Sequence, residues 1–255
     1  MATKVVGKKL ALTPARKLVV EMMYHAAKVP SIPVSREMNV ARLLDARSSA
    51  SEPPAWTALF MRAYGIVAQQ VPELRRAFMP WPTAHLYEHP FSVGALVVER
   101  DLDGEAALLA AKITEPESLS AREIQTKIDR LKNTPVWEIG DFRQLLRIGM
   151  LPGFLRRFVF WQSLYWSGAK RAKRFGTFMV SSYGSLGAEQ VHPRTPLTTL
   201  LTFGPIAKNG DVTVKIIYDH RVMDGRTVAG ALAKLQKVLD EQLPAELATP
   251  LQRAA

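Results

Sequence analysis

IIYDHRVMDGRTVAG, residues 216–230, combines an apolar run, a histidine between charged residues and a carboxylate followed by glycine. The run begins with β-branched and aromatic residues, which favour a strand. From Gly225 onward, apolar residues recur every three or four positions, which predicts a helix to about residue 242. His220 therefore lies where a strand ends and a loop begins. A strand end fixes a side chain while the loop leaves it accessible, so His220 is a candidate general base.

The charged neighbours of His220 have two interpretations each. Asp224 could orient the site through an ion pair, or it could be the N-cap of the following helix. From these residues alone the N-cap is the favoured interpretation. Asp219 and Arg221 could be ordinary surface charges at a strand end.

A second candidate stretch is FGTFMVSSYGSLG, residues 175–187, which predicts a strand entering a tight loop. A hydroxyl of Ser181 or Ser182 could donate a hydrogen bond to the oxyanion of a tetrahedral intermediate, which contributes about 3 kcal/mol for one donor. A plain polar turn is the alternative. No Gly-x-Ser-x-Gly elbow is present, so a serine nucleophile is not indicated.

The remaining patterns predict one mixed α/β domain over residues 1–255. Asn209-Gly210 is the strongest hairpin signal and should join two of the strands. We expect helices at about residues 14–27, 55–72 and 120–132, and strands at 31–40, 91–100, 106–113, 197–206 and 211–219.

Composition limits the classes of function. The chain has 255 residues, 47% of them hydrophobic, which is enough for a substantial core. It has no cysteine, which excludes disulfides, thiolate-bound zinc and a cysteine nucleophile. Its five histidines form no ligand pair, so we expect no metal.

The amino terminus lacks a signal peptide, and no window reaches the roughly 18 apolar residues that span a bilayer. A cytoplasmic location is expected, with membrane association at most at the surface.

The formal net charge of +11 favours an anionic partner, such as nucleic acid, lipid headgroups or a phosphate-bearing cofactor. No zinc-finger or RNA-recognition signature is present, so we do not expect nucleic acid to be the partner.

Residues 140–174 differ from the rest of the chain. They hold eight Lys and Arg residues against a single acid, Asp141, together with aromatic residues at helical spacing. Basic amphipathic helices with tryptophan are typical of membrane-surface binding. We therefore expect a helical pair, and contact with anionic lipid or with a hydrophobic substrate is one hypothesis for its role. The more common alternative is that the pair packs on the protein body or on a neighbouring subunit.

Taken in order, these stretches resemble the catalytic domain of the dihydrolipoyl acyltransferases, the cores of the 2-oxoacid dehydrogenase complexes, which are related to chloramphenicol acetyltransferase. YDHRVMDG (218–225) is similar to the family's His-x-x-x-Asp-Gly signature, and GTFMVSSYGSLG (176–187) is similar to its serine strand and loop. LTPARKLVVEMM (12–23) resembles the first helix, IPVSREMNV (32–40) the following strand, and ALFMRAYGIVAQQVPELRRAF (58–78) the long helix.

The resemblance implies a chloramphenicol acetyltransferase-like mixed β-sheet with flanking helices and transfer of an acyl group between coenzyme A and a thiol or hydroxyl, without an acyl-enzyme. His220 would be the general base, and Ser181 would stabilise the oxyanion, with its sequence neighbour Ser182 in support. Asp224 would be structural and paired with Arg16, with its sequence neighbour Gly225 in support. The family forms homotrimers with the site between subunits, so Ser181 and His220 would come from different subunits.

Several features depart from the family. Ser182 replaces the family's asparagine, no lipoyl domain is present, the carboxyl terminus EQLPAELATPLQRAA (241–255) ends polar, and residues 140–174 look like an insertion. We therefore expect a free-standing acyltransferase. The alternatives are an enzyme that acts on lipoyl groups of a separate chain, or a non-catalytic trimeric scaffold.

Overall fold

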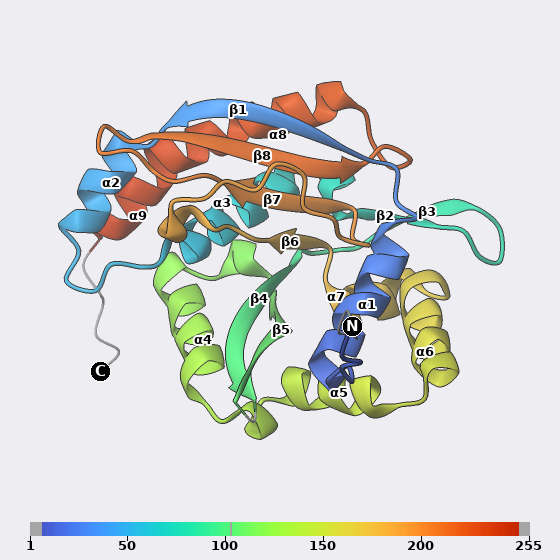
Figure 1. The fold of residues 1–255 in the computed structure, drawn as a ribbon. Helices are drawn as coiled ribbons and strands as arrows, with labels where there is room; N and C mark the ends of the chain where they lie inside the picture. Colours follow the sequence, from blue (N-terminus) through green and yellow to red (C-terminus); the bar gives the residue numbers. More distant parts are fainter. Residues whose placement is uncertain (1–6, 103, 250–255) are drawn as a thin grey trace, which may run out of the picture.

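A computed structural model describes residues 7–102 and 104–249 of the chain. The predicted strands form a six-stranded mixed sheet in the order β1-β8-β7-β6-β4-β5 (Figure 1). The bounds are β1 Ser31–Asn39, β4 Val93–Leu102, β5 Glu105–Thr114, β6 Phe178–Val180, β7 Thr199–Phe203 and β8 Asp211–Asp219. The expected single α/β fold is therefore confirmed.

One face of the sheet packs on long helices and forms the main core. Phe178 of β6 stacks on Tyr64 of α3, with ring centroids 4.3 Å apart. Val228, Leu232 and Leu235 bury one face of α8, as their three- and four-residue spacing predicts. The helices in this layer and their extensions are α2 Ala41–Ser48, α3 Trp56–Gln70, α4 Ala121–Asn133, α8 Gly225–Lys237 and α9 Leu243–Ala248.

The opposite face of β4, β5 and β6 is covered by α1 (Pro14–Ala26) and by the segment that looked distinct in sequence. That segment forms three helices, α5 Gly140–Met150, α6 Gly153–Tyr165 and α7 Gly168–Phe175, where a pair was expected. Leu18, Phe160 and Leu164 make a second, smaller core between α1 and α6. Gly149 of α5 lies so close to α1 that a Cβ atom on it would be 2.6 Å from the Pro14 carbonyl oxygen.

Caps and turns follow the sequence signals closely. Ser120 and Glu123 make the predicted capping box at α4, and Gly210 adopts a positive φ of 86° in the turn before β8. The expected neighbouring strands β4 and β5 pair antiparallel over their whole length. Their connection includes Asp103, which is outside the described residues, as is the carboxyl-terminal end of the polar tail, residues 250–255.

Other elements differ from the prediction. The serine strand is short, because only Phe178–Val180 pair with neighbours before the chain leaves the sheet. A helix, α2, and a two-stranded hairpin of β2 (Arg76–Met79) and β3 (His85–Glu88) were not predicted. In agreement with the prediction, α3 ends near Pro72, where a 3₁₀ turn begins (Pro72–Arg75). After α8, Val238–Gln242 forms a π-helical turn. Further 3₁₀ turns are Pro116–Ser118, Val136–Glu138 and Gly184–Leu186.

Candidate active site

His220 is the first residue after β8, as the sequence pattern predicts. Its backbone N–H donates to the Pro30 carbonyl at 3.2 Å, which fixes the end of β8 against the start of β1. The ring lies beside that of Tyr218, with centroids 5.5 Å apart. The side chain is 44% exposed, so a substrate can reach its nitrogen atoms.

Asp224 lies beside His220, with its Oδ1 atom 3.7 Å from the His220 Nδ1 atom. It occupies the N-cap position of α8 but makes no capping hydrogen bond, so the favoured N-cap interpretation is not realised by the side chain. Its side chain is 85% exposed. Gly225 begins α8, and a Cβ atom there would be only 3.4 Å from the Tyr218 hydroxyl oxygen.

The expected pairing of Asp224 with Arg16 is not formed within the chain. Among the described residues, the ion pairs include none between these two side chains. Arg16 lies near the amino-terminal end of α1, next to Glu105 and Leu108 of β5, and its backbone N–H donates to the Thr13 hydroxyl at 3.3 Å. The sheet order explains the separation, because β5 is at one edge of the sheet and β8 is four strands away from it.

The two candidate serines have different surroundings. The Ser182 hydroxyl donates to the Phe203 carbonyl at 2.6 Å and accepts from the Gly184 N–H at 3.0 Å, so it closes the loop after β6. The Ser181 N–H donates to the Leu201 carbonyl, which continues the pairing of β6 with β7. Within the described residues, the Ser181 hydroxyl has no hydrogen bond to protein, so it remains able to donate to a ligand.

Ser181 and His220 do not meet within one chain. Ser181 follows Val180, which pairs with Leu201 of β7. On the other side of β7, Thr202 pairs with Lys215 of β8. His220 is five residues beyond Lys215, and at about 3.3 Å per residue it is some 16 Å further along the sheet.

A loop connects the two ends across the face of the sheet. Between β6 and β7, the Glu189 carboxylate pairs with Lys215, and Gln190 accepts from the Thr202 hydroxyl at 3.2 Å. Further on, His192 Nε2 lies 3.1 Å from the Ser31 hydroxyl, at the end of the sheet that holds His220. His192 belongs to no recognisable motif in the sequence, and only the path of this loop brings it to the end of the sheet that holds His220.

A buried charge cluster supports the end of β8. Asp219 is almost fully buried and accepts from Arg221 at 2.9 Å and 2.7 Å, so it is not the surface charge that was considered. Arg171 of α7, also buried, donates to the carbonyls of Phe78 and Pro196 at 3.2 Å and 2.7 Å. Burial lowers the pKa of Arg171 to about 10, and the nearby Asp219 charge opposes this shift.

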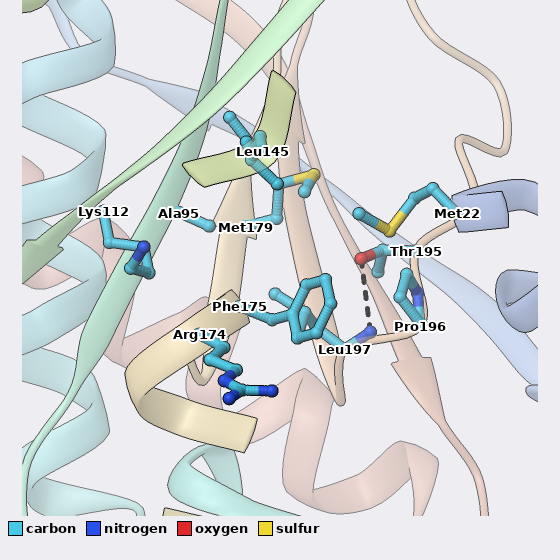
Figure 2. A pocket seen from close by; sticks show the side chains of 11 residues that line it. Met22, Ala95, Lys112, Leu145, Arg174, Phe175, Met179, Thr195, Pro196 and Leu197 are labelled. Carbon is cyan, nitrogen blue, oxygen red and sulfur yellow. Dashed lines mark hydrogen bonds between the residues drawn. The ribbon is translucent and has the colours of Figure 1, made fainter. Parts of the chain in front are cut away.

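One narrow, mostly apolar gap lies against the sheet among the described residues. The gap between α1, α5 and α7 is lined by apolar groups such as Met22, Leu145 and Met179, and holds only about 20 Å³ (Figure 2). In the part of the chain that the structure describes, no three His, Asp or Glu side chains are grouped as metal ligands. Exposed His220, rather than a closed cavity, is therefore the chemical centre of the candidate site.

Comparison with solved structures identifies the architecture. A dihydrolipoamide acetyltransferase from Azotobacter vinelandii superposes with a TM-score of 0.69 at 15% identity, over 96% of this chain and 95% of that one. The chain has the chloramphenicol acetyltransferase-like fold. A probable dihydrolipoamide acetyltransferase from Listeria monocytogenes matches with a TM-score of 0.65 at 16% identity, over 98% of both chains. A chloramphenicol acetyltransferase matches with a TM-score of 0.52 at 12% identity, over 90% of this chain and 96% of that one.

Identities this low establish the chloramphenicol acetyltransferase-like fold alone. No protein-family model and no curated protein sequence matches the chain. The resemblance read from the sequence motifs is confirmed at the level of fold, over nearly the whole chain. The Azotobacter study concerned the roles of a serine, a histidine and an asparagine, the last four positions after the histidine, in the catalytic mechanism of that enzyme.

Proposed function

We propose that this protein is an acyltransferase that moves an acyl group directly between coenzyme A and a thiol or hydroxyl acceptor. The observation that carries the proposal is His220, held at a strand end and open to solvent, with the carboxylate of Asp224 3.7 Å away, in a fold shared with acetyltransferases. The net charge of +11 suits a substrate with several phosphates.

His220 performs the proton transfers in this proposal. Its ring takes the proton from the acceptor thiol or hydroxyl as the sulfur or oxygen atom attacks the thioester carbonyl. The tetrahedral intermediate then breaks its carbon–sulfur bond to coenzyme A, and the leaving thiolate recovers the proton from the ring. The reverse reaction uses the same groups. No covalent bond to the protein forms at any step.

Ser181 stabilises the oxyanion of that intermediate, and it does so from a second copy of the chain. A hydroxyl without another partner is suited to this task because it can turn toward the developing charge. Ser181 and His220 of one chain are some 16 Å apart along the sheet, too far to share one carbonyl group. A homotrimer with its sites between subunits would bring the two ends together.

Asp224 acts on the ring of His220. Its carboxylate lies 3.7 Å from Nδ1, so a small movement would let it accept a hydrogen bond from the ring and fix the orientation of the ring. The asparagine at the matching spacing in the Azotobacter enzyme supports a role in orientation, since an amide can accept the same hydrogen bond without a charge.

Mixed assemblies test both the chemistry and its location between subunits. His220→Ala and Ser181→Ala chains are each expected to lose acyl transfer from acetyl-CoA to a dithiol, by about 100-fold or more for the general base. When the two variants are unfolded, mixed and refolded together, some interfaces regain both residues, so activity should return to a substantial fraction of wild type. A His220→Ala chain with full activity would refute the base, and mixtures that stay inactive would refute the shared site.

The same assay separates the enzyme from a scaffold. A non-catalytic trimer would keep its mass in solution but show no turnover with any acyl-CoA. Replacing the dithiol with a lipoylated domain as the acceptor would reveal an enzyme that serves lipoyl groups of a separate chain, because its turnover would rise sharply.

A further inference from the structure

The helix α6 is apolar on the side that it turns to solvent. Its buried side is formed by Arg156, Phe160, Ser163 and Leu164. On the opposite side, Phe154 is 75% exposed and Phe158 58% exposed, and Leu155 is exposed between them. A surface helix ordinarily has polar residues in these positions. The outer side of α6 is therefore an apolar surface that none of residues 7–102 and 104–249 covers.

Aromatic rings extend this surface beyond α6. Phe158 stacks on Trp161 at 6.2 Å between ring centroids, and Trp161 contacts Trp166 at 6.1 Å. Trp166 in turn stacks at 6.1 Å on Trp81, from the loop between β2 and β3. The hairpin and α6 lie at the same edge of the molecule (Figure 1). Below, this surface is called the aromatic face; it consists of Trp81, Phe154, Leu155, Phe158, Trp161 and Trp166.

Cationic side chains are exposed on α5 and α7, the two helices that contact α6 on either side of it in the chain. Lys170 and Lys173 are exposed on α7, which begins two residues after Trp166. Next to Val159 of α6 there is a hollow lined by three arginines, Arg143, Arg147 and Arg174. No carboxylate is among the residues that line it. The single acid of residues 140–174, Asp141, is already paired with Lys112 at 2.7 Å.

We propose that the aromatic face docks on the surface of an anionic lipid membrane. Phenylalanine and tryptophan side chains enter the boundary between headgroups and acyl chains, while the lysines and arginines contact the anionic headgroups. The docking is peripheral, since within the described residues no helix has the length and apolarity to cross a bilayer. It is independent of the acyl-transfer chemistry, because it uses none of His220, Asp224 or Ser181.

Charge argues against a two-fold contact with a second copy of this chain on the aromatic face. A two-fold symmetric contact places the same surface on both sides. The lysines and arginines of α5 and α7 would then approach their own copies, with no free carboxylate nearby to compensate them. An anionic membrane supplies both the apolar phase for the rings and the opposite charge for these side chains.

Vesicle flotation of the full chain tests the proposal. The wild-type protein should float with vesicles of phosphatidylcholine and phosphatidylglycerol, and much less with phosphatidylcholine alone. The double variant Phe154→Ser/Phe158→Ser should lose about tenfold or more in partitioning, because two apolar side chains no longer leave water. Lys170→Gln/Lys173→Gln should lose about tenfold on the anionic vesicles only. Tryptophan emission of the wild type should shift to shorter wavelength on binding.

Two matched controls make the test specific. Lys234→Gln/Lys237→Gln removes two exposed lysines at the same spacing on α8, away from the aromatic face, and should bind as the wild type does. Trp137→Ser and Trp166→Ser change the same residue type at the same exposure of 50%, but only Trp166 belongs to the aromatic face, so only that variant should bind weakly.

Two outcomes would overturn the proposal. One is equal binding of the wild type to both vesicle types, or no binding to either. The other is unchanged flotation of the Phe154→Ser/Phe158→Ser variant with a loss of oligomer mass by light scattering, which would assign the aromatic face to a contact between copies. Acyl transfer in solution by the same variant should equal that of the wild type, so failure here is distinguishable from failure of the proposed enzyme.

Discussion

Ser181 and His220 border the same strand, β7, at its opposite ends. Ser181 follows β6, which runs parallel to β7, and His220 follows β8, which runs antiparallel to it. Two residues that each follow a strand therefore leave the sheet in opposite directions. Under the proposed mechanism, Ser181 and His220 of one chain lie too far apart to act on one substrate, so that mechanism requires copies of the chain to assemble.

Replacing Asp224 should separate its role in catalysis from any role in stability. Because the side chain is 85% exposed, Asp224→Ala should change the free energy of unfolding by less than about 1 kcal/mol, the usual limit for a surface pair. Acyl transfer should fall about tenfold because His220 is less well oriented, which corresponds to a rise of about 1.4 kcal/mol in the activation free energy. Asp224→Asn should retain more activity than Asp224→Ala. Thermal melting and steady-state kinetics on the three proteins check this, and an unstable Asp224→Ala would show that the assembly buries the carboxylate.

The adjacent serines should respond in opposite ways to the loss of a hydroxyl. Ser181→Ala should lower kcat about 100-fold and leave the melting temperature unchanged, since its hydroxyl has no partner among the described residues. Ser182→Ala should cost about 1 kcal/mol of stability, because it removes the bonds to Phe203 and Gly184. Steady-state kinetics of each variant measures kcat, and denaturant unfolding measures the change in stability. The reverse pattern would assign the oxyanion to Ser182.

Stability should fall in acid because of His25. This ring is buried between α1 and α6, with Nδ1 3.1 Å from the Tyr165 hydroxyl. Burial, and then the charge of Lys28, lower its pKa from 6.5 to about 4. From about pH 6.5 down to pH 4 the unfolded chain takes up a proton that the folded chain does not, so stability is present above this window and is lost through it, by about 3 kcal/mol.

The variant His25→Leu isolates that contribution. Denaturant unfolding at several pH values should show a shallower slope between pH 6.5 and 4 for His25→Leu than for the wild type. Identical slopes would mean that the ring takes up its proton in the folded state as readily as in the unfolded one.

The close contact of α1 and α5 should depend on Gly149, because glycine has no Cβ atom. In Gly149→Ala the new methyl group would be 2.6 Å from the Pro14 carbonyl oxygen, so the helices must separate at a cost of about 1–3 kcal/mol. Gly230→Ala is the matched control in α8, where a Cβ atom meets nothing within 4 Å. That change should stabilise by about 0.4–1 kcal/mol. Chemical denaturation would contradict the argument if both changes had the same sign.

Local patterns were sufficient for much of the fold. The spacing of apolar residues located α1, α3 and α8, the capping-box pattern of Ser120 and Glu123 located α4, and the turn at Gly210 located the connection into β8. The hairpin of β2 and β3 escaped prediction because its strands are only four residues long, and because the loop between them holds Pro80 and Pro82, which read as a break in the pattern. α2 has a largely polar sequence and buries only Leu43, so it lacks the periodic signal by which helices are recognised.

The candidate site was also predictable from the sequence only in part. His220 at a strand end, and Ser181 before a loop, follow from residues that are neighbours in sequence. Nothing in the sequence near Asp219 indicated its burial. Arg221 is a neighbour in sequence, but Arg171, whose charge lies near Asp219, comes from α7, and the carbonyl of Thr198, to which the Asp219 N–H donates, directly precedes β7. Arg16 was paired with Asp224 on the strength of a resemblance alone, and the position of α1 beside β5 separates them.

The sequence by itself determined the elements and the chemistry of their ends, because helix periodicity, caps and turns depend on residues a few positions apart. Only the tertiary structure decided which ends lie together. The order and direction of strands, which put Ser181 and His220 at opposite ends of β7, are set by burial of both sheet faces over the whole chain. The exposure of Phe154 and Phe158 was likewise decided by packing, because α6 buries its other side against α1.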